Sequence, residues 1–280
     1  MKRNLRKKLC AAVFFCAFVC GISAAPVLAI TLSGEVMTVS STGEEGTVPD
    51  AAITLFDKED NPIAETTSDN NGAFLIDVEG DELPDVYFLT TKADFVDTYT
   101  QGYHFVADED ELELPLLPLE ETEKVIDSVE GVRPVDESEG IIAGVVEVLY
   151  DGDYTPLAGV RVKATDGLGN DILCDELYLN EEQEWDPTLE QTSETGVFAL
   201  YNIAMPEAPP QNFVLTLVGA DPKYFFVVTG GKVFPYKPDD ASPESITVVY
   251  MIGWEPGAGE DIPIDDGGGG GGCFVSGVSP

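Results

Sequence analysis

Short runs in which apolar and polar residues alternate fill most of the chain beyond residue 29, and turn residues separate them. This period of two is typical of strands that bury one face, whereas no segment keeps a helical period over several turns. The chain is therefore predicted to be all-β. The runs predict strands at 30–39, 51–56, 86–91, 103–106 and 112–117, and again at 213–218, 224–229 and 245–252.

The alternation also predicts which side chains face a core. In the strand at 51–56, the odd-numbered residues would share the buried face. The Asp-Asn-Asn-Gly sequence at 69–72 predicts a turn, because Asn and Gly tolerate positive φ. It precedes Phe74, Ile76 and Val78, which would lie together on one face of the next strand.

The order of these segments occurs twice, which indicates a duplicated domain. The spacing between matched segments rises from 109 to 124 residues along the chain, so the second copy would hold an insertion of about fifteen residues, placed at 170–190. The matched pairs are 33–36 with 143–146, 48–53 with 157–162, and 72–74 with 196–198.

Each copy has Gly-x-Val, then a strand like Pro-x-Ala-Gly-Val-x-Val, then a turn like Thr-Ser-Asp-x-x-Gly-x-Phe, then an aromatic-rich strand. This order resembles the carboxypeptidase regulatory-like family of prealbumin-like β-sandwiches. The resemblance implies two tandem Greek-key sandwiches at 30–118 and 140–254. The first copy departs from the family pattern at Asp50 and Ala51, and the second is one residue short at 193–196.

Two segments lie outside these predicted domains. Residues 119–139 contain eight acidic residues and are interpreted as a solvated linker, with a short helix at 120–129 as the alternative. Residues 255–280 include six consecutive glycines, which predict a flexible tether. The following Cys273-Phe274-Val275 resembles the tails of some exported bacterial proteins that carry a processing or surface-sorting signal. The last five residues supply neither the apolar span nor the basic end of such a signal.

The N-terminus predicts export. Five basic residues within the first eight precede an apolar run at 9–20, and small residues follow at 26–29. We expect a signal peptide at 1–29, cleaved after Ala29. An uncleaved anchor and a lipoprotein at Cys16 or Cys20 are the alternatives, and the bulky residues before each of these cysteines disfavour the second.

The charge balance narrows the choice of partners. The 280 residues are 44% hydrophobic, enough for packed cores, and carry 52 acidic against 14 basic side chains for a net charge of −38. Cleavage would remove five basic residues and no acidic one. This balance excludes nucleic acid and anionic membrane surfaces, which require basic partners. We predict instead a protein or polysaccharide partner at the cell surface.

No catalytic, cofactor-binding or metal site is predicted from side-chain types. His104 is the only histidine and is expected to be a packing residue of its strand. After signal cleavage only Cys174 and Cys273 remain, and whether they pair is left open. Their distance from His104 along the chain does not match a zinc motif.

Calcium is the one cofactor considered, because three turns collect oxygen-bearing side chains. None of them matches a twelve-residue calcium loop, so the simpler interpretation is that the carboxylates cap turns in a very acidic chain. The three turns are Asp57 with Glu59, Asp60 and Asn61; Asp69 with Asn70 and Asn71; and Asp108 with Glu109, Asp110 and Glu111.

The predicted function is that of an exported, non-enzymatic structural or binding protein of the cell surface or extracellular space, with the periplasm as an alternative location. A different class is a carbohydrate- or calcium-dependent binding accessory protein. In that hypothesis the insertion at 170–190 is a binding loop, and Trp185 is its aromatic anchor.

Overall fold

The structure is a computed structural model of the whole chain, and it describes residues 29–39, 45–150, 152–207, 209–226, 229–237 and 244–255. The predicted signal peptide and tail lie outside these residues apart from Ala29 and Glu255. Within the described ranges, no helix has the length and apolar character needed to cross a bilayer.

The N-terminal half, residues 29–118, consists of strands in two facing sheets. In one sheet β1 lies between antiparallel β5 and parallel β9, with β2 on its far end; the other has the order β7-β6-β3-β4, and β8 pairs with β6. The strands are β1 (Ala29–Val39), β2 (Glu45–Thr47), β3 (Ala52–Phe56), β4 (Pro62–Thr67), β5 (Ala73–Glu79), β6 (Leu83–Thr91), β7 (Asp97–Thr100), β8 (Tyr103–Phe105) and β9 (Glu109–Pro115).

The C-terminal half, residues 140–255, repeats this pairing around its own first strand. Here β10 lies between antiparallel β15 and parallel β19, and β12-β16-β18 form the facing sheet. The strands are β10 (Gly140–Tyr150), β11 (Asp153–Pro156), β12 (Arg161–Thr165), β13 (Asp175–Leu179), β14 (Trp185–Asp186), β15 (Val197–Ile203), β16 (Gln211–Val218), β17 (Phe225–Phe226), β18 (Gly230–Val233) and β19 (Ser245–Trp254).

The all-β prediction is confirmed, and so are the predicted buried faces. Ala51, Ile53 and Leu55 have no exposed surface, and the three residues predicted after the turn at 69–72 are each at most 6% exposed. The strand predicted at 224–229 is shorter than expected. Of the predicted segment, only β17 forms a strand, and it pairs with β19. Residues 227–228 lie outside the described residues. The next strand, β18, pairs with β16 in the other sheet.

The first part of the segment between the halves is helical, in agreement with the helix alternative at 120–129, and this part is not fully solvated. Helix α1 (Leu119–Val129) buries Val125 and Val129 in an apolar cluster together with Ile141 and Ile246 of the C-terminal half. The sequence places its apolar residues at helical spacing among glutamates, so one side of the helix packs on the sheet. The acidic composition of the segment concealed this pattern.

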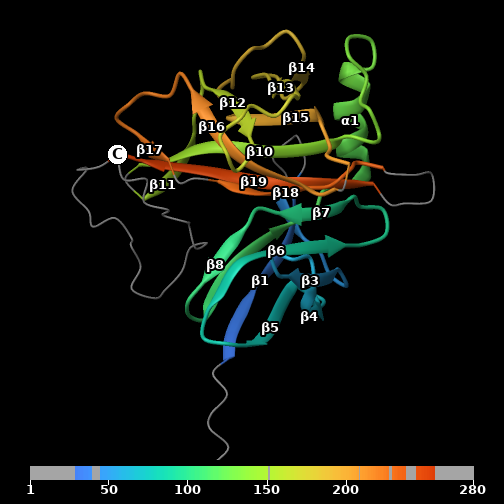
Figure 1. Cartoon of the computed structure of the whole chain (residues 1–280), viewed down its shortest axis with the longest axis vertical. Coiled ribbons are helices and arrows are strands. Elements are labelled where there is room, and N and C mark those ends of the chain that lie inside the picture. Colours follow the sequence, from blue (N-terminus) through green and yellow to red (C-terminus); the bar gives the residue numbers. More distant parts are fainter. Residues whose placement is uncertain are drawn as a thin grey trace, which may run out of the picture.

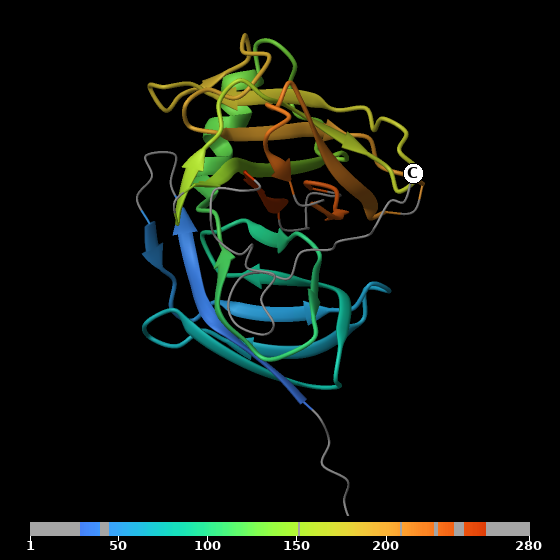
Figure 2. The same ribbon diagram turned by 90° about the vertical axis from the view of Figure 1, so that its left-hand side faces the viewer.

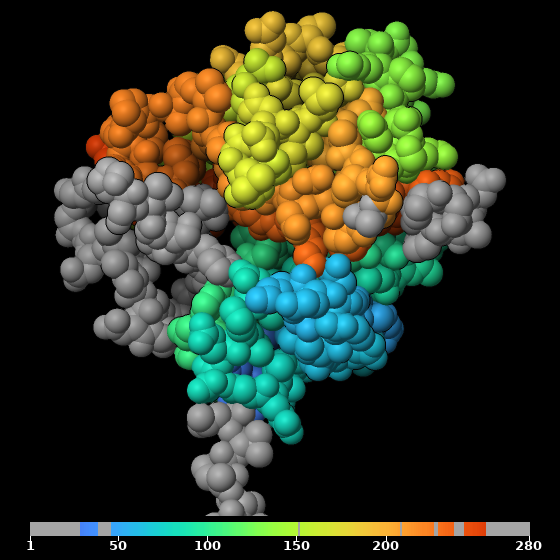
Figure 3. Space-filling model, viewed as in Figure 1, coloured from blue at the N-terminus to red at the C-terminus, as the bar shows by residue number. Residues whose placement is uncertain are grey.

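One long sheet joins the two halves. Its order is β14-β13-β15-β10-β19-β7-β6-β3-β4, and the link is the parallel pair of β19 with β7, from Ser245 opposite Asp97 to Val248 opposite Thr100. In Figures 1 and 2 the halves lie one above the other on either side of this pair, and Figure 3 shows them as two lobes. Each half has a core cluster of its own, and a third cluster beneath α1 combines Val96 of the N-terminal half with residues of the C-terminal half.

The two smaller sheets pack on opposite faces of the long sheet. Paired residues in neighbouring strands share a face. Thr90 lies opposite core residue Ile53 and also opposite Thr98, which in turn lies opposite Ile246. The core of the C-terminal half instead contains Val249, three residues further along β19 and therefore on the other face.

Hydrogen bonds of the N-terminal half occur at matching positions of the C-terminal half. The Ser68 hydroxyl donates to the carbonyl of Val48 at 2.8 Å and accepts the N–H of Ala51 at 2.9 Å. Thr192 makes the same two bonds, at 2.7 and 3.1 Å, with the residues 109 positions after those partners. The spacings are the ones on which the predicted repeat depends.

Two glycines are required where the first and last strands of each half approach closely. A Cβ atom on Gly34 would lie 1.9 Å from the carbonyl oxygen of Leu112, and one on Gly144 would lie 2.4 Å from that of Val249. Both distances are far below van der Waals contact. Each half therefore needs a glycine at this point of its first strand.

Candidate functional site

The inserted segment 170–190 contains strands, so its prediction as a loop is wrong. Strand β13 pairs with β15 and β14 pairs with β13, which extends the long sheet. A polar cavity of about 300 Å³ lies where this insertion meets β12 and the segment after α1. The residues that line it are Arg133, Arg161, Cys174, Asp175, Glu176, Leu189 and Glu190.

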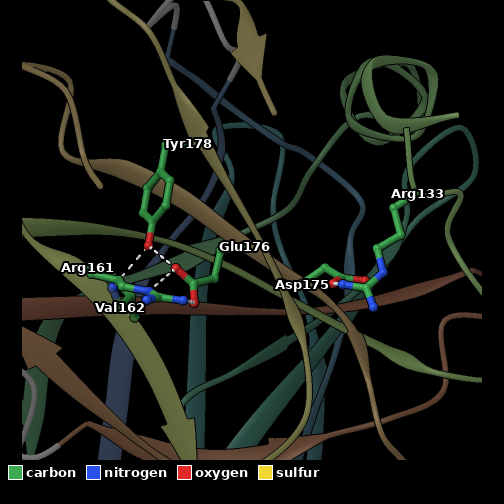
Figure 4. Close-up of polar contacts among 6 residues, drawn as sticks. All are labelled: Arg133, Arg161, Val162, Asp175, Glu176 and Tyr178. Carbon is green, nitrogen blue, oxygen red and sulfur yellow. Dashed lines mark hydrogen bonds and ion pairs between the residues drawn. The ribbon is translucent and has the colours of Figure 1, made fainter. Parts of the chain in front are cut away.

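A hydrogen-bonded network ties β12 to β13, and Figure 4 shows its geometry. The Arg161 guanidinium binds the Glu176 carboxylate with Nε at 2.8 and 2.7 Å from its two oxygens and Nη2 at 2.6 Å from Oε1. The Tyr178 hydroxyl donates to Glu176 Oε2 at 2.9 Å and accepts the backbone N–H of Val162 at 3.1 Å. We call these four residues the Arg161 network.

The electrostatics of the Arg161 network favour its present protonation states. Burial raises the pKa of the Tyr178 hydroxyl, whose side chain has no exposed surface. The hydrogen bonds that Arg161 donates to the Glu176 carboxylate raise the pKa of its guanidinium. A neutral tyrosine and a charged arginine are what the observed hydrogen bonds require. The network is therefore a stable structural contact.

A second pair attaches the segment after α1 to the same insertion. Arg133 binds the Asp175 carboxylate, which is 10% exposed. Asn202 donates to the other oxygen of Asp175 at 2.9 Å and to the carbonyl of Pro134 at 3.1 Å. These bonds join the start of β13, strand β15 and the chain that follows the helix. Figure 4 shows the pair of Arg133 with Asp175.

The cavity does not resemble a catalytic or anion-binding site. Its two arginines face three carboxylates, and both guanidiniums are already paired. Burial raises the pKa of the Cys174 thiol to about 11, which suppresses the reactive thiolate. Cys273, whose pairing with Cys174 the sequence leaves open, lies outside the described residues. The arrangement fixes the insertion in place and holds no activated nucleophile.

Trp185 does not project from a loop as the binding hypothesis requires. It lies in β14 and packs, half-buried, against the apolar cluster that contains Val125 and Val129 of α1. Since the ring covers part of this cluster, its area contributes to the packing of the helix. The location gives it a structural role.

His104 lies on the outward face of its strand, and its side chain is 28% exposed. Its neighbours Tyr103 and Phe105 are buried, and the alternation of β8 directs His104 outward. Its Nε2 lies 2.9 Å from Glu82 Oε1. The side chain therefore makes a surface polar contact between β8 and the start of β6.

Two of the predicted acidic turns are built as turn caps, because Asp57 and Asp69 each accept hydrogen bonds from backbone N–H groups two and four residues further along the chain. Such bonds are the usual reason for an aspartate at a turn. In the third, Asp108 instead accepts the N–H of Thr31 from the distant strand β1. Among the described residues, no three His, Cys, Asp or Glu side chains converge in an arrangement that could hold a metal ion.

A cluster at the junction of the two halves was not predicted from the sequence. Phe56, Tyr87 and Tyr99 of the N-terminal half and Phe234 of the C-terminal half form this junction cluster. The Phe234 ring stacks on Tyr99 with centroids 4.0 Å apart and lies 6.1 Å from Tyr87, which stacks on Phe56 at 5.3 Å. Burial raises the pKa of Tyr99 to about 12. The four residues of the junction cluster are too far apart in the sequence for a local pattern to reveal them.

One lysine completes the junction. The ammonium of Lys232 in β18 binds the Asp60 carboxylate and the carbonyl of Lys58, both in the turn after β3. It also lies 5.4 Å from the centre of the Tyr87 ring, whose hydroxyl donates to Asp60 at 2.7 Å. The Lys232 side chain is only 13% exposed, so these contacts are largely shielded from solvent and salt.

No model of a known protein family matches the chain, and no curated protein matches it. Among solved structures it is similar to the Bacillus anthracis TIE protein, at 11% identity and a TM-score of 0.23, covering 80% of this chain and 33% of that one. It is also similar to the shaft pilin SpaA from Lactobacillus rhamnosus GG, at 7% identity and a TM-score of 0.27, covering 82% of this chain and 99% of that one.

A further similar structure is GBS52, the minor pilin of Streptococcus agalactiae, at 12% identity and a TM-score of 0.28, covering 81% of this chain and 96% of that one. The chain spans a third of the length of the TIE protein and nearly all of the two pilins. Similarity as low as this says nothing about what the present chain binds or builds.

Proposed function

We propose that this chain is an exported structural protein of the cell surface or extracellular space, in which two copies of one sandwich domain form a rigid spacer. The observation that carries the proposal is the pairing of β19 with β7, which makes one sheet of two halves that each have a core cluster of their own. Tandem domains joined by a linker alone move relative to each other. A continuous sheet prevents that motion.

Side-chain contacts on both faces of the sheet support rigidity at the junction. On one face are the junction cluster and Lys232 with Asp60. On the other face, Val96 of the N-terminal half packs in the same apolar cluster as Val125 and Val129 of α1. A bend at the β19–β7 pair in either direction would open one of these contacts.

The proposal of two copies rests on equivalent hydrogen bonds and glycines. We assign the domains to 30–118 and 140–254, with α1 and the segment after it between them, a signal peptide at 1–29 and a tail at 255–280. We propose the Greek-key sandwich of the carboxypeptidase regulatory-like family for both. Asp50 supports this, because it adopts a φ of 53° at the position where Gly159 has 79°. The departure from the family at Asp50 thus keeps the same backbone conformation.

The proposed role is non-enzymatic. His104 is engaged with Glu82 at the surface, Cys174 has a raised pKa, and the arginines of the polar cavity are paired with carboxylates. The net charge of −43 that remains after cleavage (9 basic against 52 acidic residues) would keep such a spacer soluble outside the cell and repel nucleic acid and anionic membranes. Its partner is then a protein or a polysaccharide at the surface.

Spin labels in the two halves test the proposal. Cysteines replace the exposed Asn70 and Glu181, while Cys174→Ala and Cys273→Ser remove the native thiols. The full chain is expressed with its own N-terminal segment and recovered from outside the cell. We expect a mature chain beginning at Ile30 and a single narrow distance distribution by electron double resonance.

The matched variants locate the source of rigidity. Lys232→Ala with Phe234→Ala removes the junction contacts and should broaden the distance distribution. Lys223→Ala with Phe225→Ala makes the same chemical change away from the junction and should leave it narrow. A broad distribution in the parent chain, or retention of the chain in the cytoplasm, would overturn the proposal.

A further inference from the structure

The outward face of the long sheet in the C-terminal half is covered at one end only. At that end α1 packs on Ile141, Ala143 and Ile246. Strands β11 and β17 flank the opposite ends of β10 and β19 (Figure 1). The face there carries apolar and aromatic side chains that no described helix or strand covers.

Four of these side chains form a row across four neighbouring strands. Leu149 of β10 lies opposite Tyr154 of β11 and opposite Trp254 of β19, and Trp254 lies opposite Phe225 of β17. Tyr154 and Phe225 at the ends of the row are each 56% exposed. Strands lie about 4.8 Å apart, so the row is about 14 Å long. We call it the aromatic row.

The alternation of the strands confirms that the aromatic row faces outward. Val146 and Met251, on the same two central strands, point into the core on the opposite side. Leu149 and Trp254 are three residues further along and therefore face away from that core. Ile252 lies on the same outward face as Trp254 and adds to the apolar surface.

A carboxylate lies beside the aromatic row without a partner. Glu147 lies two residues before Leu149 on the same face, between Pro156 and Ile252 on the neighbouring strands. Among the described residues nothing forms a hydrogen bond or ion pair with it, and burial raises the pKa of its carboxyl. A half-desolvated acceptor on an apolar surface gains free energy when a ligand supplies a donor.

We propose that this face binds an extended, uncharged polysaccharide, whose rings lie across the aromatic row and whose hydroxyl groups donate to Glu147. Aromatic rings offer flat apolar surfaces to the C–H faces of sugar rings. The spacing of neighbouring strands is close to the length of one pyranose unit in an extended glycan, so successive sugars would lie over successive side chains of the row.

The negative charge of the chain favours an uncharged ligand over the other candidates for this face. A second copy of the mature chain, with 9 basic and 52 acidic residues, would bring another net charge of −43 to the surface, and a polyanionic glycan would be repelled in the same way. The segment 256–280 contains four acidic and no basic residues, so it would bring like charge towards Glu147. An uncharged polymer with many hydroxyl groups meets neither obstacle.

The test uses the full mature chain and insoluble glycans. Cellulose, chitin, mannan and curdlan, all uncharged, are each incubated with the protein, and the bound fraction is measured against concentration. We expect retention on at least one glycan. Tyr154→Ala and Trp254→Ala should each weaken binding about tenfold, the range expected for loss of one ring contact.

Tyr150 provides the matched control. It is 59% exposed, close to the 56% of Tyr154, but it is adjacent to Leu149 on β10 and so points to the other face. Tyr150→Ala should leave binding unchanged, and Glu147→Gln should weaken it without lowering the stability of the chain, because the amide carries no buried charge. Circular dichroism of each variant checks that it is folded.

Three outcomes would overturn the proposal. The first is retention on none of the four glycans. The second is equal weakening by Tyr150→Ala and Tyr154→Ala, which would place binding elsewhere. The third is stronger binding to poly-L-lysine than to any glycan, abolished by Glu147→Gln, which would assign the face to a basic protein. A narrow spin-label distance in the same samples would leave the spacer proposal standing in each case.

Discussion

The two halves have the same arrangement of central strands, but the chain takes a different path after β3 in the N-terminal half than after β12 in the C-terminal half. In both, the first strand lies between an antiparallel and a parallel neighbour. In the N-terminal half β4 returns along β3, whereas in the C-terminal half β13 leaves β12 and joins β15 in the other sheet. One sandwich pattern therefore accepts two paths for the same part of the chain.

The difference shows how a sandwich satisfies a strand edge that has lost its neighbour. Ile53 of β3 lies opposite Thr66 of β4. Val162, the matching residue of β12, has no neighbouring strand on the corresponding side among the described residues, and its backbone N–H donates to the Tyr178 hydroxyl instead. A buried N–H without an acceptor is costly. The Tyr178 hydroxyl of β13 thus takes the place of a backbone acceptor that β4 supplies in the N-terminal half.

The largest predicted effect comes from the glycines that both halves share. Gly34→Ala would place a Cβ atom 1.9 Å from the carbonyl oxygen of Leu112, and Gly144→Ala would place one 2.4 Å from that of Val249. Because both obstacles are backbone atoms, the strands must separate. We expect losses in the free energy of unfolding of about 3 kcal/mol or more, larger for Gly34→Ala.

Urea unfolding measures these losses and also tests whether the halves unfold together. Since β19 pairs with β7, each variant should shift a single transition that includes both halves. Gly131→Ala is the control, because nothing lies within 4 Å of the added atom. Two separate transitions, with one variant affecting each, would show that the shared sheet does not couple the halves.

The next effect is confined to the C-terminal half. Tyr178→Phe removes the hydroxyl that accepts the Val162 N–H and binds Glu176, so we expect a loss of about 1–3 kcal/mol in the free energy of unfolding. Amide hydrogen exchange should accelerate at Val162 and remain unchanged at Ile53, where β4 is present. Tyr154→Phe alters an exposed tyrosine and should change neither quantity.

The sequence was sufficient for the parts of the fold that depend on local alternation. Phe74, Ile76 and Val78 are buried as their spacing indicates. The matched segments around Gly34 and Gly144 occupy equivalent positions beside β5 and β15. Burial of alternate side chains is a local property of a strand, so it can be inferred from one segment at a time.

Strand exchange and the junction could not be inferred in this way. Strand β13 has the composition of an acidic loop, and its pairing with β15 depends on residues 20 to 26 positions away. The Arg161 network joins Arg161 to Glu176, 15 residues further along the chain. Phe234 stacks on Tyr99, 135 residues earlier in the chain. Only tertiary structure brings such residues together, and their types were common elsewhere in the chain.

The smallest predicted effect is a change in the pKa of an aspartate in a turn that occurs in both halves. This turn was not among the matched segments from which the repeat was predicted. Asp57 and Asn61 follow β3, and Asp166 and Asn170 follow β12 at the same separation of 109 residues. The Asn side-chain amide is the main cause that lowers the pKa of each aspartate from its ordinary value of 3.8. Backbone N–H donors add to it.

Because the folded-state pKa of each aspartate lies below the unfolded value, these hydrogen bonds stabilise the fold above pH 3.8 and are lost as the pH falls through the folded-state pKa. Asn61→Ala and Asn170→Ala should each raise the pKa of only their own aspartate, measured by NMR titration of the carboxyl carbons. At neutral pH the midpoint of unfolding should hardly change, since both carboxylates are exposed to solvent. A shift at Asp57 without one at Asp166 would mean that the two turns differ in solution, and the equivalence of the halves would then end at their central strands.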